Sequence, residues 1–355
     1  MGQVVVFTQP RSVGFEWYDD PPLEPHEVRL RTLYSGISAG TELTAYRGSN
    51  PYLHKQWDAT RKLFVSAEQP TLTYPVSGWG YEEVGEVVEL GNEVQDVSIG
   101  DIIFGTWGHR THHIVEEEYA RTRIQTKSLD AIFGIFSQIG SIALNGVHDA
   151  RIRMGETVAV FGMGTLGQIV GQLARRSGGY VVGIDRFKKR LEIAEQSGAA
   201  DIVLNADEGE VAEQIRAITD NRGADVAIEV TGSPLALNQA IRSVAYSAKV
   251  IALGFFQGEA VGLFLGEEFH HNRVNVVGSQ IFGTDPELTY RWNRLRLVQT
   301  FMRLQADGMI ELKPIISHVI PFDEAGEAFR IADQEPENAL QIVLDCTKMG
   351  RISMK

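Results

Sequence analysis

The chain has 355 residues, of which 43% are hydrophobic and 22% charged, and its formal net charge is −13 at pH 7. At about 150 residues per domain this length predicts two domains of ordinary globular composition. The acidic balance argues against nucleic acid or an anionic membrane surface as a partner, because both are recognised by basic patches. We expect no membrane helix, since no apolar run approaches about 20 residues. Because the N-terminus also lacks a signal-peptide pattern, we expect a cytoplasmic protein.

The chain has one cysteine, Cys346, which excludes intrachain disulfides and any cysteine-rich zinc knuckle. Cys346 lies in the apolar run LQIVLDCTKMG near the C-terminus. We therefore expect it to be a small packing residue.

Roughly the first 125 residues predict a compact, β-rich domain. Short strand-like runs are broken by many glycines and prolines: VVVFTQ (4–9), EVRLRTLYSG (27–36), EVVEL (86–90) and DIIFG (101–105).

The middle of the chain predicts a parallel sheet covered by helices on both faces. Continuous runs rich in Val, Ile and Ala alternate with amphipathic helical stretches, as in a doubly wound α/β domain. The expected strands are 157–161, 180–185, 200–205, 224–230, 249–255 and 274–279. Six such strands suit a Rossmann domain.

A glycine motif follows the first of these strands and opens a helix. Gly162 permits a tight turn, Gly164 lets the backbone approach a pyrophosphate, and Gly167 lets the helix pack closely on the strand. The first helical residues, Thr165 and Leu166, belong to a helix N-terminus that offers N–H groups and a positive dipole end to phosphates. The motif predicts a dinucleotide site.

The end of the second strand indicates which dinucleotide is bound. Asp185 lies 18 residues after Gly167, where a carboxylate can accept the ribose hydroxyls of NAD and repel the 2′-phosphate of NADP. Arg186 is the opposing signal, because an arginine beside the ribose can pair with that phosphate. We expect NAD as the cofactor and NADP as the weaker alternative.

The C-terminal segment predicts a strand, a helix and another strand that are extra to a six-stranded Rossmann sheet. These elements (313–334 and 339–345) are expected to return to the N-terminal domain. The predicted division is 1–126 with 300–355 for the first domain and 127–299 for the Rossmann domain.

This order of parts resembles the medium-chain dehydrogenase/reductase superfamily, which joins a GroES-like β-rich catalytic domain to a Rossmann domain. The matching stretches are GISAGTE (36–42), GYEEVGEVVELG (80–91), GDIIFG (100–105), VFGMGTLGQ (160–168), EVTGSP (229–234) and HVIPFDEAGEAF (318–329). The chain is more similar to the threonine- and bacteriochlorophyllide-dehydrogenase-like branches than to yeast or liver alcohol dehydrogenases. The resemblance implies an NAD(P)-dependent oxidoreductase in which Thr231 also contacts the cofactor.

The zinc ligands that the resemblance implies are missing from this sequence. Where zinc-bearing members have a cysteine before a Gly-Thr-Asp stretch, this chain has Ser38 and Ala39 before Gly-Thr-Glu. The histidine position of a Gly-His-Glu motif is Tyr81, and the third ligand position matches Gln138. Zinc prefers Cys, His or carboxylate ligands in a tetrahedral array. We therefore expect no catalytic zinc, and the four-cysteine structural lobe is absent as well.

Another group must then stabilise the charge that builds on the reacting oxygen during hydride transfer. The resemblance places Tyr81 where a metal ligand would be, Thr41 at the hydroxyl that starts the family's proton relay, and Glu82 at the acidic residue behind the metal. A phenol is a plausible proton donor for reduction. The alternative is that Tyr81 only fills the space of the lost metal.

Three histidines, His109, His112 and His113, cluster in GHRTHHIV. Neighbouring residues on a strand point to opposite faces, so a three-histidine metal site is not expected. One of them could line the substrate site, and His318 is expected to be structural.

The segment 284–304 carries Tyr290, Trp292 and the arginines Arg291, Arg294, Arg296 and Arg303. These could bind an anionic or sugar-like substrate, or form a surface helix paired with carboxylates.

The leading hypothesis is a zinc-independent, NAD-dependent oxidoreductase acting on an alcohol, polyol or carbonyl compound. Two alternatives remain: a quinone-reductase-like reductase of activated double bonds, which Asp185 disfavours because such relatives mostly prefer NADPH, and an NAD(H)-binding protein whose catalytic site has decayed.

The family usually pairs subunits through the last Rossmann strand, here 274–279. An exposed sheet edge favours such pairing, so we expect a homodimer or a homotetramer.

Overall fold

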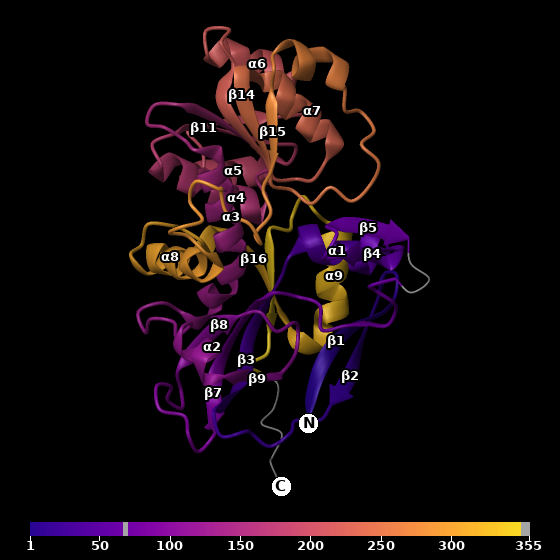
Figure 1. Cartoon of the computed structure of the whole chain (residues 1–355), viewed down its shortest axis with the longest axis vertical. Coiled ribbons are helices and arrows are strands. Elements are labelled where there is room, and N and C mark those ends of the chain that lie inside the picture. Colours follow the sequence, from indigo (N-terminus) through magenta and orange to yellow (C-terminus); the bar gives the residue numbers. More distant parts are fainter. Residues whose placement is uncertain (67–69, 349–355) are drawn as a thin grey trace. The chain divides into compact units, whose positions relative to one another are not determined.

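The computed structural model describes residues 1–66 and 70–348 and divides the chain into two compact units. Unit 1 comprises Met1–Gln138 and Ser317–Lys355, and unit 2 comprises Ile139–Ile316. The elements of both units are labelled in Figure 1.

The expected domain boundaries, 126/127 and 299/300, need correction, because both lie further along the chain. Gly134 packs within unit 1, where an added Cβ would lie 2.7 Å from Val84 Cγ2. The second predicted boundary cuts through helix α8 (Arg294–Ala306), whose buried Phe301 packs against Gly140 of unit 2. Tight packing of these residues, which sequence patterns do not reveal, sets the boundaries.

Unit 2 is a doubly wound Rossmann fold with a six-stranded sheet in the order β12-β11-β10-β13-β14-β15. All neighbouring strands are parallel. The strands are β10 (Thr157–Phe161), β11 (Tyr180–Asp185), β12 (Ile202–Asn205), β13 (Ala224–Glu229), β14 (Val244–Ala252) and β15 (Asn275–Gly278). The helices are α3 (Phe136–Ala150), which begins in unit 1, α4 (Thr165–Arg176), α5 (Lys188–Gln196), α6 (Val211–Ile218), α7 (Pro234–Ser243) and α8, with short turns η3 (Leu265–Phe269) and η4 (Lys313–Ile315).

The expected strands of unit 2 are all present, and the run expected at 249–255 belongs to a strand that begins earlier, at Val244, and ends at Ala252. Every residue of β10 is buried, which explains the unbroken apolar sequence TVAVF. The carboxyl ends of β10 and β11 lie side by side, so Phe161 pairs with Ile184 just before the glycine turn and Asp185.

Unit 1 is built mainly from antiparallel strands. One sheet has the order β2-β1-β6, and a second has the order β16-β17-β3-β7-β8, with β9 also paired to β3. The strands are β1 (Gly2–Gln9), β2 (Ser12–Tyr18), β3 (Glu27–Ile37), β4 (Lys55–Asp58), β5 (Leu63–Ser66), β6 (Val76–Ser77), β7 (Glu82–Leu90), β8 (Ile102–Gly105), β9 (His112–Glu116), β16 (Ile316–Pro321, whose first residue ends unit 2) and β17 (Gln341–Asp345). The helices are α1 (Ala39–Arg47), α2 (Glu117–Arg121) and α9 (Ala325–Gln334), with short turns η1 (Pro51–Leu53), η2 (Ala131–Ile135) and η5 (Phe322–Glu324).

The C-terminal segment completes unit 1, as Figure 1 shows for α9 beside β1 and β2. Strand β17 pairs antiparallel with β3, where Ile342 lies opposite Ile37. Phe329 of α9 contacts Phe7 of β1 at 4.9 Å between ring centroids, in an edge-to-face arrangement. Cys346 is buried in the same apolar core, as expected for a packing residue.

The expectation about membrane helices needs one correction. The segment Ala131–Ala150 is 20 residues long and apolar enough to span a membrane by length and composition alone. Gln138, Ser141 and Asn145 interrupt its apolar run, so the sequence pattern concealed it. In the folded chain 72% of the most apolar part of this segment is buried, which is typical of a core helix.

Candidate active site

Three hydroxyl groups meet at the N-terminus of α1. The Ser38 hydroxyl shares a hydrogen bond with the Tyr81 hydroxyl, and Thr41 Oγ1 lies 3.3 Å from the same phenol oxygen. Ser38 is the N-cap residue of α1, Thr41 lies in its first turn, and Tyr81 directly precedes β7. We call Ser38, Thr41 and Tyr81 the hydroxyl cluster. The structure thus brings together two of the expected catalytic residues and adds Ser38 as a direct partner.

Glu82 lies beneath this cluster and is fully buried. Its Oε2 accepts a hydrogen bond of 2.8 Å from Gln341 Nε2, whereas its Oε1 has no hydrogen-bond partner among the residues that the structure describes. Burial, with the nearby charge of Glu42, raises the pKa of the Glu82 carboxyl well above its usual value. The Glu82 carboxyl is therefore shifted toward its protonated form.

The phenol of Tyr81 is also held in its protonated form. Burial, reinforced by the charge of Glu82, raises the pKa of Tyr81 far above the usual value, although the hydroxyls of Ser38 and Thr41 oppose the shift. Because a deprotonated phenol is strongly disfavoured here, Tyr81 suits the role of a proton donor and does not suit that of a resident base.

A second group of buried polar side chains lies next to the hydroxyl cluster: Ser35, Glu42, Glu83 and His109. His109 Nε2 lies 2.5 Å from Glu42 Oε2, and His109 Nδ1 lies 2.7 Å from Ser35 Oγ. Ser35 Oγ donates to Glu83 Oε1 at 3.2 Å. All four residues are nearly or fully inaccessible to solvent. Sequence reasoning did not link His109 to Glu42, because 67 residues separate them.

These residues do not fit a catalytic zinc ion. Ala39 has no ligand atom, the hydroxyls of Ser38 and Tyr81 bond each other, and Gln138 is a buried amide in the first turn of α3. Zinc in proteins takes Cys, His or carboxylate ligands. Within residues 1–66 and 70–348, no group of three or more His, Cys, Asp and Glu side chains is placed to hold a metal.

The three clustered histidines point to different surroundings. His109 contacts Glu42 and Ser35, whereas His112 Nδ1 lies 3.2 Å from Thr111 Oγ1. His113 stacks on the Trp107 ring at 5.8 Å between centroids. His112 and His113 are consecutive residues of β9, as the alternation predicted. His318 lies on β16, with Nδ1 3.0 Å from Ser317 Oγ.

In unit 2, the glycine motif forms the turn between β10 and α4. Gly162 has a φ of +99°, and an added Cβ would lie 2.4 Å from Thr231 Cγ2, so only glycine fits. Gly164 is the N-cap of α4, and an added Cβ on Gly167 would lie 1.7 Å from the Gly162 carbonyl oxygen. Thr165 and Leu166 open α4, whose first N–H groups have no partner within the helix. The turn therefore presents backbone donors suited to a pyrophosphate.

Asp185, at the end of β11, holds this turn in place. Its Oδ2 accepts the Met163 N–H at 2.7 Å, and its Oδ1 accepts the Phe187 N–H at 3.0 Å. Each carboxylate oxygen has a second lone pair that can accept a ribose hydroxyl. Arg186 is exposed and forms an ion pair with Asp207.

Arg190, which sequence reasoning missed, lies closer to the turn. Its Nη1 is 3.7 Å from Asp185 Oδ2 and would be 3.5 Å from a Cβ on Gly164. The signal in the sequence is its spacing of five residues after Asp185, in the first turn of α5. Thr231 lies beside the same turn: its N–H donates to Glu229 Oε1 at 2.8 Å, and its methyl group faces Gly162.

The aromatic and arginine-rich segment 284–304 makes contacts both within itself and with other parts of unit 2, such as the ion pair of Asp285 with Arg151. Arg296 lies over the Trp292 ring at 4.3 Å and Arg291 over the Tyr290 ring at 5.5 Å. Trp292 packs edge-to-face against His148 at 4.4 Å. A role for these arginines in substrate binding stays a prediction.

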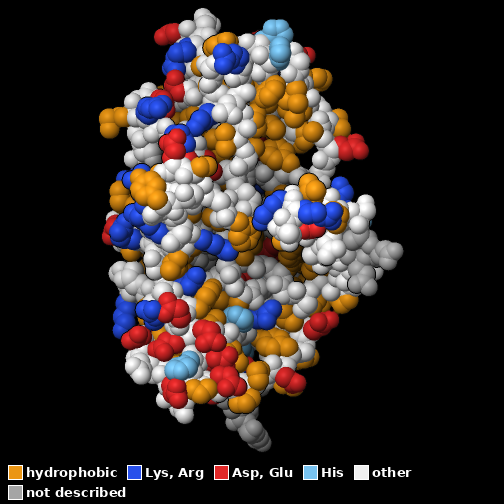
Figure 2. Space-filling view, in the orientation of Figure 1, with side chains coloured by type: hydrophobic (Ala, Val, Ile, Leu, Met, Phe, Trp, Pro, Cys, Tyr) orange, Lys and Arg blue, Asp and Glu red, His pale blue; other side chains and the backbone are white. Residues whose placement is uncertain are grey.

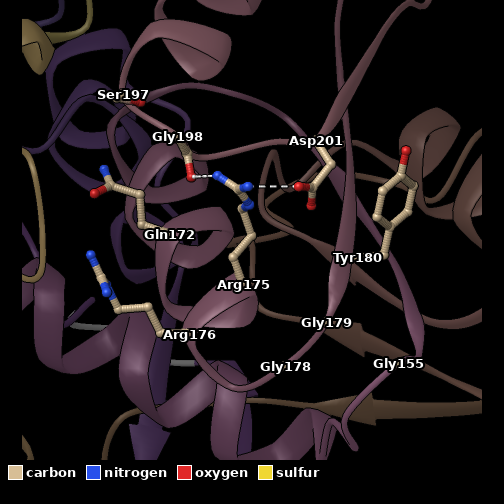
Figure 3. A pocket seen from close by; sticks show the side chains of 10 residues that line it. All are labelled: Gly155, Gln172, Arg175, Arg176, Gly178, Gly179, Tyr180, Ser197, Gly198 and Asp201. Atoms are coloured by element: carbon tan, nitrogen blue, oxygen red, sulfur yellow. Dashed lines mark hydrogen bonds and ion pairs between the residues drawn. The ribbon is translucent and has the colours of Figure 1, made fainter.

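A pocket of about 570 Å³ in unit 2 lies away from the glycine turn (Figure 3). Arg175 crosses it, with Nη1 donating to the Gly198 carbonyl at 2.8 Å and Nη2 lying 2.7 Å from Asp201 Oδ1. Tyr180, at the amino end of β11, lines this pocket, whereas ligands of such sheets bind at the carboxyl ends of the strands. We assign it no role in the reaction.

The sheet order, the glycine turn and the β-rich unit with its C-terminal return define a dinucleotide-dependent oxidoreductase. Residues 165–297 match the profile described as zinc-binding dehydrogenase. A D-guloside 3-dehydrogenase of Escherichia coli K12 is 30% identical over 95% of this chain and 98% of its own length. An L-threonine 3-dehydrogenase of Pyrococcus horikoshii is 27% identical over 88% of this chain and 90% of its own length.

Solved structures share the whole fold. The 2R,3R-butanediol dehydrogenase of Bacillus subtilis has a TM-score of 0.77 at 21% identity, covering 97% of this chain and 99% of its own. Galactitol-1-phosphate dehydrogenase of Escherichia coli has a TM-score of 0.75 at 19% identity, with the same coverage. The chain belongs to the zinc-binding dehydrogenase family of the medium-chain dehydrogenase/reductase superfamily, and it is an oxidoreductase of the alcohol dehydrogenase type.

Proposed function

We propose that this oxidoreductase is NAD-dependent and zinc-independent, and that it interconverts a secondary hydroxyl and a carbonyl on a polyol or sugar-like substrate. The observation that carries the proposal is the hydroxyl cluster, in which Tyr81 bonds Ser38 and Thr41 at the positions that resemble the family's metal site.

Bound NAD supplies or accepts the hydride, and the side chains of unit 1 manage the proton. In the reducing direction the Tyr81 O–H donates to the carbonyl oxygen, on which negative charge develops. The Ser38 and Thr41 hydroxyls can each pass a proton to Tyr81, since a hydroxyl both donates and accepts. The buried Glu82 carboxyl, whose pKa is raised, lies close to this cluster as a further group that can hold a proton. In the oxidising direction the alcohol proton passes to the Tyr81 oxygen as the phenol gives its own proton to Ser38 or Thr41, so Tyr81 need not be deprotonated beforehand, and an ionised Glu82 can take up the released proton.

NAD is favoured over NADP by the charges near the glycine turn. Asp185 presents a carboxylate beside the turn, and a 2′-phosphate would be repelled by it. Two basic residues could offset this repulsion: Arg186 is paired with Asp207, and Arg190 Nη1 lies 3.7 Å from Asp185 Oδ2. We propose Gly162, Gly164, Thr165, Leu166, Gly167, Asp185, Arg190 and Thr231 as the cofactor contacts.

The substrate class is supported by the names of the relatives. The relatives at 30% and 27% identity are named for a guloside and for threonine, both of which carry a secondary hydroxyl. Among these, the guloside dehydrogenase covers the largest share of this chain, 95%. We therefore place glycosides first in a substrate search.

A homodimer formed at the β15 edge completes the proposal. Strand β15 ends the sheet of unit 2. Figure 2 shows hydrophobic side chains gathered over the region where Figure 1 labels α7 and β15. Exposed apolar residues of unit 2 include Leu235, Val261, Phe264 and Leu265. Exposed apolar patches beside a free strand edge favour subunit pairing. The cytoplasmic location stays a prediction.

The test is a substrate panel combined with metal analysis. Purified protein is assayed with NAD⁺ and NADP⁺ against methyl hexopyranosides, free polyols and threonine, after the metal content has been measured. We expect NAD⁺-dependent oxidation of a glycoside or polyol by protein carrying well under one equivalent of zinc, at a rate unaffected by chelators. Activity that requires one equivalent of bound zinc would contradict the zinc-independent mechanism.

A further inference from the structure

The buried side chain of His109 joins two parts of unit 1 that carry the hydroxyl cluster. Glu42, in the first turn of α1, accepts the N–H of Ser38 on Oε1 at 2.8 Å and faces His109 with Oε2. The Glu42 carboxylate therefore satisfies the N-terminus of α1, and the N-cap side chain of Ser38 makes no capping bond of its own. This leaves the Ser38 hydroxyl available to Tyr81.

The other side of the imidazole is bonded to the central sheet. Ser35 on β3 donates its hydroxyl proton to Glu83 on β7, so its oxygen must accept the hydrogen bond from His109 Nδ1. His109 Nε2 faces a carboxylate oxygen at 2.5 Å. Both ring nitrogens are then donors, which is the hydrogen-bond pattern of an imidazolium. The hydrogen bonds thus run without a break from Glu42 of α1 through His109 and Ser35 to Glu83 of β7. The other oxygen of Glu83 accepts the Trp107 N–H at 2.6 Å.

The space around His109 is shaped to admit the ring. Gly80, the residue before Tyr81, has a φ of +113°, and an added Cβ would lie 3.0 Å from both His109 Nε2 and Glu83 Oε1. Phe329 of α9 packs edge-on against the imidazole at 5.7 Å between ring centroids. The ring thus lies directly beside the backbone that carries Tyr81.

We infer that His109 is a positioning residue for the proposed reaction: as an imidazolium bonded to Glu42 and Ser35, it fixes the start of α1 against the start of β7. The inference rests on the proposed function only where it predicts an effect of His109 on turnover. The two segments that it joins supply every member of the hydroxyl cluster, and the backbone pairing of β3 with β7 ends just beside them, at Gly36 opposite Glu82. A buried ionic network in which every group is hydrogen-bonded can hold the segments that it joins in a single arrangement.

The groups facing His109 make this link sensitive to pH. They are Glu42 from α1 and Glu83 from β7, with Glu82 beside Glu83, Ser35 from β3 and the apolar Phe329 from α9. Burial alone lowers the pKa of His109, but the charge and hydrogen bond of Glu42, with the charge of Glu83, outweigh it and raise the pKa above its usual value. The link is therefore intact below that raised pKa and is lost as the pH rises through it.

The experiment follows Tyr81 directly, so that it does not require a substrate. Full-length protein is labelled with 3-fluorotyrosine, and the residue-81 signal in the ¹⁹F NMR spectrum is assigned by its absence in Tyr81→Phe. In the wild type we expect this signal to change as the pH rises above 6.5, the usual pKa of histidine. In His109→Asn it should be shifted and lack that pH step. Ser35→Ala is the milder second variant, in case His109→Asn does not fold, and should weaken the step. His318→Asn, a histidine on β16 outside the network, is the control.

Activity gives the second readout once a substrate is found. We expect His109→Asn to lower kcat about 10- to 100-fold, the range found for groups that orient the ligands of metal sites. NADH binding should be unchanged. The double variant His109→Asn/Glu42→Gln, which can restore a neutral hydrogen bond, should recover part of the loss. An unchanged residue-81 signal in His109→Asn and in Ser35→Ala would overturn the inference even if the enzyme turns over glycosides. A shifted signal in a protein that oxidises none of the panel would support the inference and count against the proposed function.

Discussion

The carboxylate of Asp185 accepts the backbone N–H of Met163 at 2.7 Å, so the residue that we assign to the ribose also holds the glycine turn in place. The preference for NAD over NADP and the geometry of the glycine turn therefore depend on the same side chain. Asp185→Ser should narrow or reverse the preference for NADH, because it removes both the negative charge and the two-oxygen contact. Fluorescence titration with NADH and NADPH measures the ratio of the two Kd values.

Asp185→Asn is the matched control for this effect, because its amide oxygen can still accept the Met163 N–H while the charge is gone. Repulsion of the 2′-phosphate predicts that Asn and Ser relax selectivity alike, with Ser the less stable protein. A wild type that already prefers NADPH would show that the arginines dominate this site.

Tyr81→Phe should lower kcat about 10²- to 10⁴-fold, the usual share of one positioned acid–base group. NADH binding should change little, since Tyr81 lies in unit 1 and the glycine turn in unit 2. Steady-state kinetics on the substrate found in the panel measures the loss. Thr41→Val should also slow the reaction, and the double variant should lose less than the product of the two effects if the residues act as one unit.

A Tyr81 that only fills space predicts a different pattern. Phenylalanine keeps the aromatic ring, so Tyr81→Phe would retain full activity while Tyr81→Ala lowers the melting temperature. That result would remove Tyr81 from the proton path.

His113 makes the folded protein sensitive to acid. Burial, with the nearby charge of Arg110, lowers the pKa of His113 to about 4. Because the folded pKa is below the unfolded value of about 6.5, its contribution to stability is present above pH 6.5 and lost as the pH falls toward 4. At about 1.4 kcal/mol per pKa unit, the shift from 6.5 to about 4 sets an upper limit of about 3.5 kcal/mol on the loss, and the true loss is smaller because the ring is partly exposed.

His113→Phe keeps a ring that can stack on Trp107 but removes the titration. Urea unfolding between pH 7 and pH 4 should show a shallower loss of unfolding free energy in this variant than in the wild type. Parallel curves for the two proteins would contradict the assignment.

The proposed dimer predicts a solution mass of twice the 39.3 kDa chain, or a multiple of it in a tetramer. Phe264→Glu and Val261→Glu, on the exposed apolar surface of unit 2, should shift the protein toward the monomer in light scattering at micromolar concentration. Ile99→Glu, an equally apolar exposed residue of unit 1, is the control and should leave the mass unchanged. A monomeric wild type would contradict the proposal.

The sequence predicted the fold well where periodicity and local motifs dominate. The strand 157–161, the glycine turn and Asp185 occur in the expected elements because each depends on contacts between near neighbours in the sheet. Helix α1 was not predicted, because GISAGTELTAYRG has glycines at its start and no clear apolar face. Since α1 brings Ser38 to Tyr81, that contact was missed too.

The buried network could not be read from the chain for a different reason. Its four residues come from four separate segments of the chain: Ser35, Glu42, Glu83 and His109. Each of them is a polar residue of a type that is usually exposed on the surface. Only the pairing of β3 with β7 and the turn at Gly80 bring them into contact. Burial that depends on long-range pairing leaves no local pattern in a sequence.

The pairing of β17 with β3 also fixes the order in which the molecule can be completed. Unit 2 is one continuous segment, so it can fold as soon as it leaves the ribosome, whereas unit 1 must wait for the last strand of the chain. Gln341, the first residue of that strand, is the hydrogen-bond partner of Glu82. During synthesis the half to which we assign the cofactor is therefore complete before the half to which we assign proton transfer. A nascent chain could therefore bind its dinucleotide, and be stabilised by that binding, before the groups assigned to proton transfer are assembled.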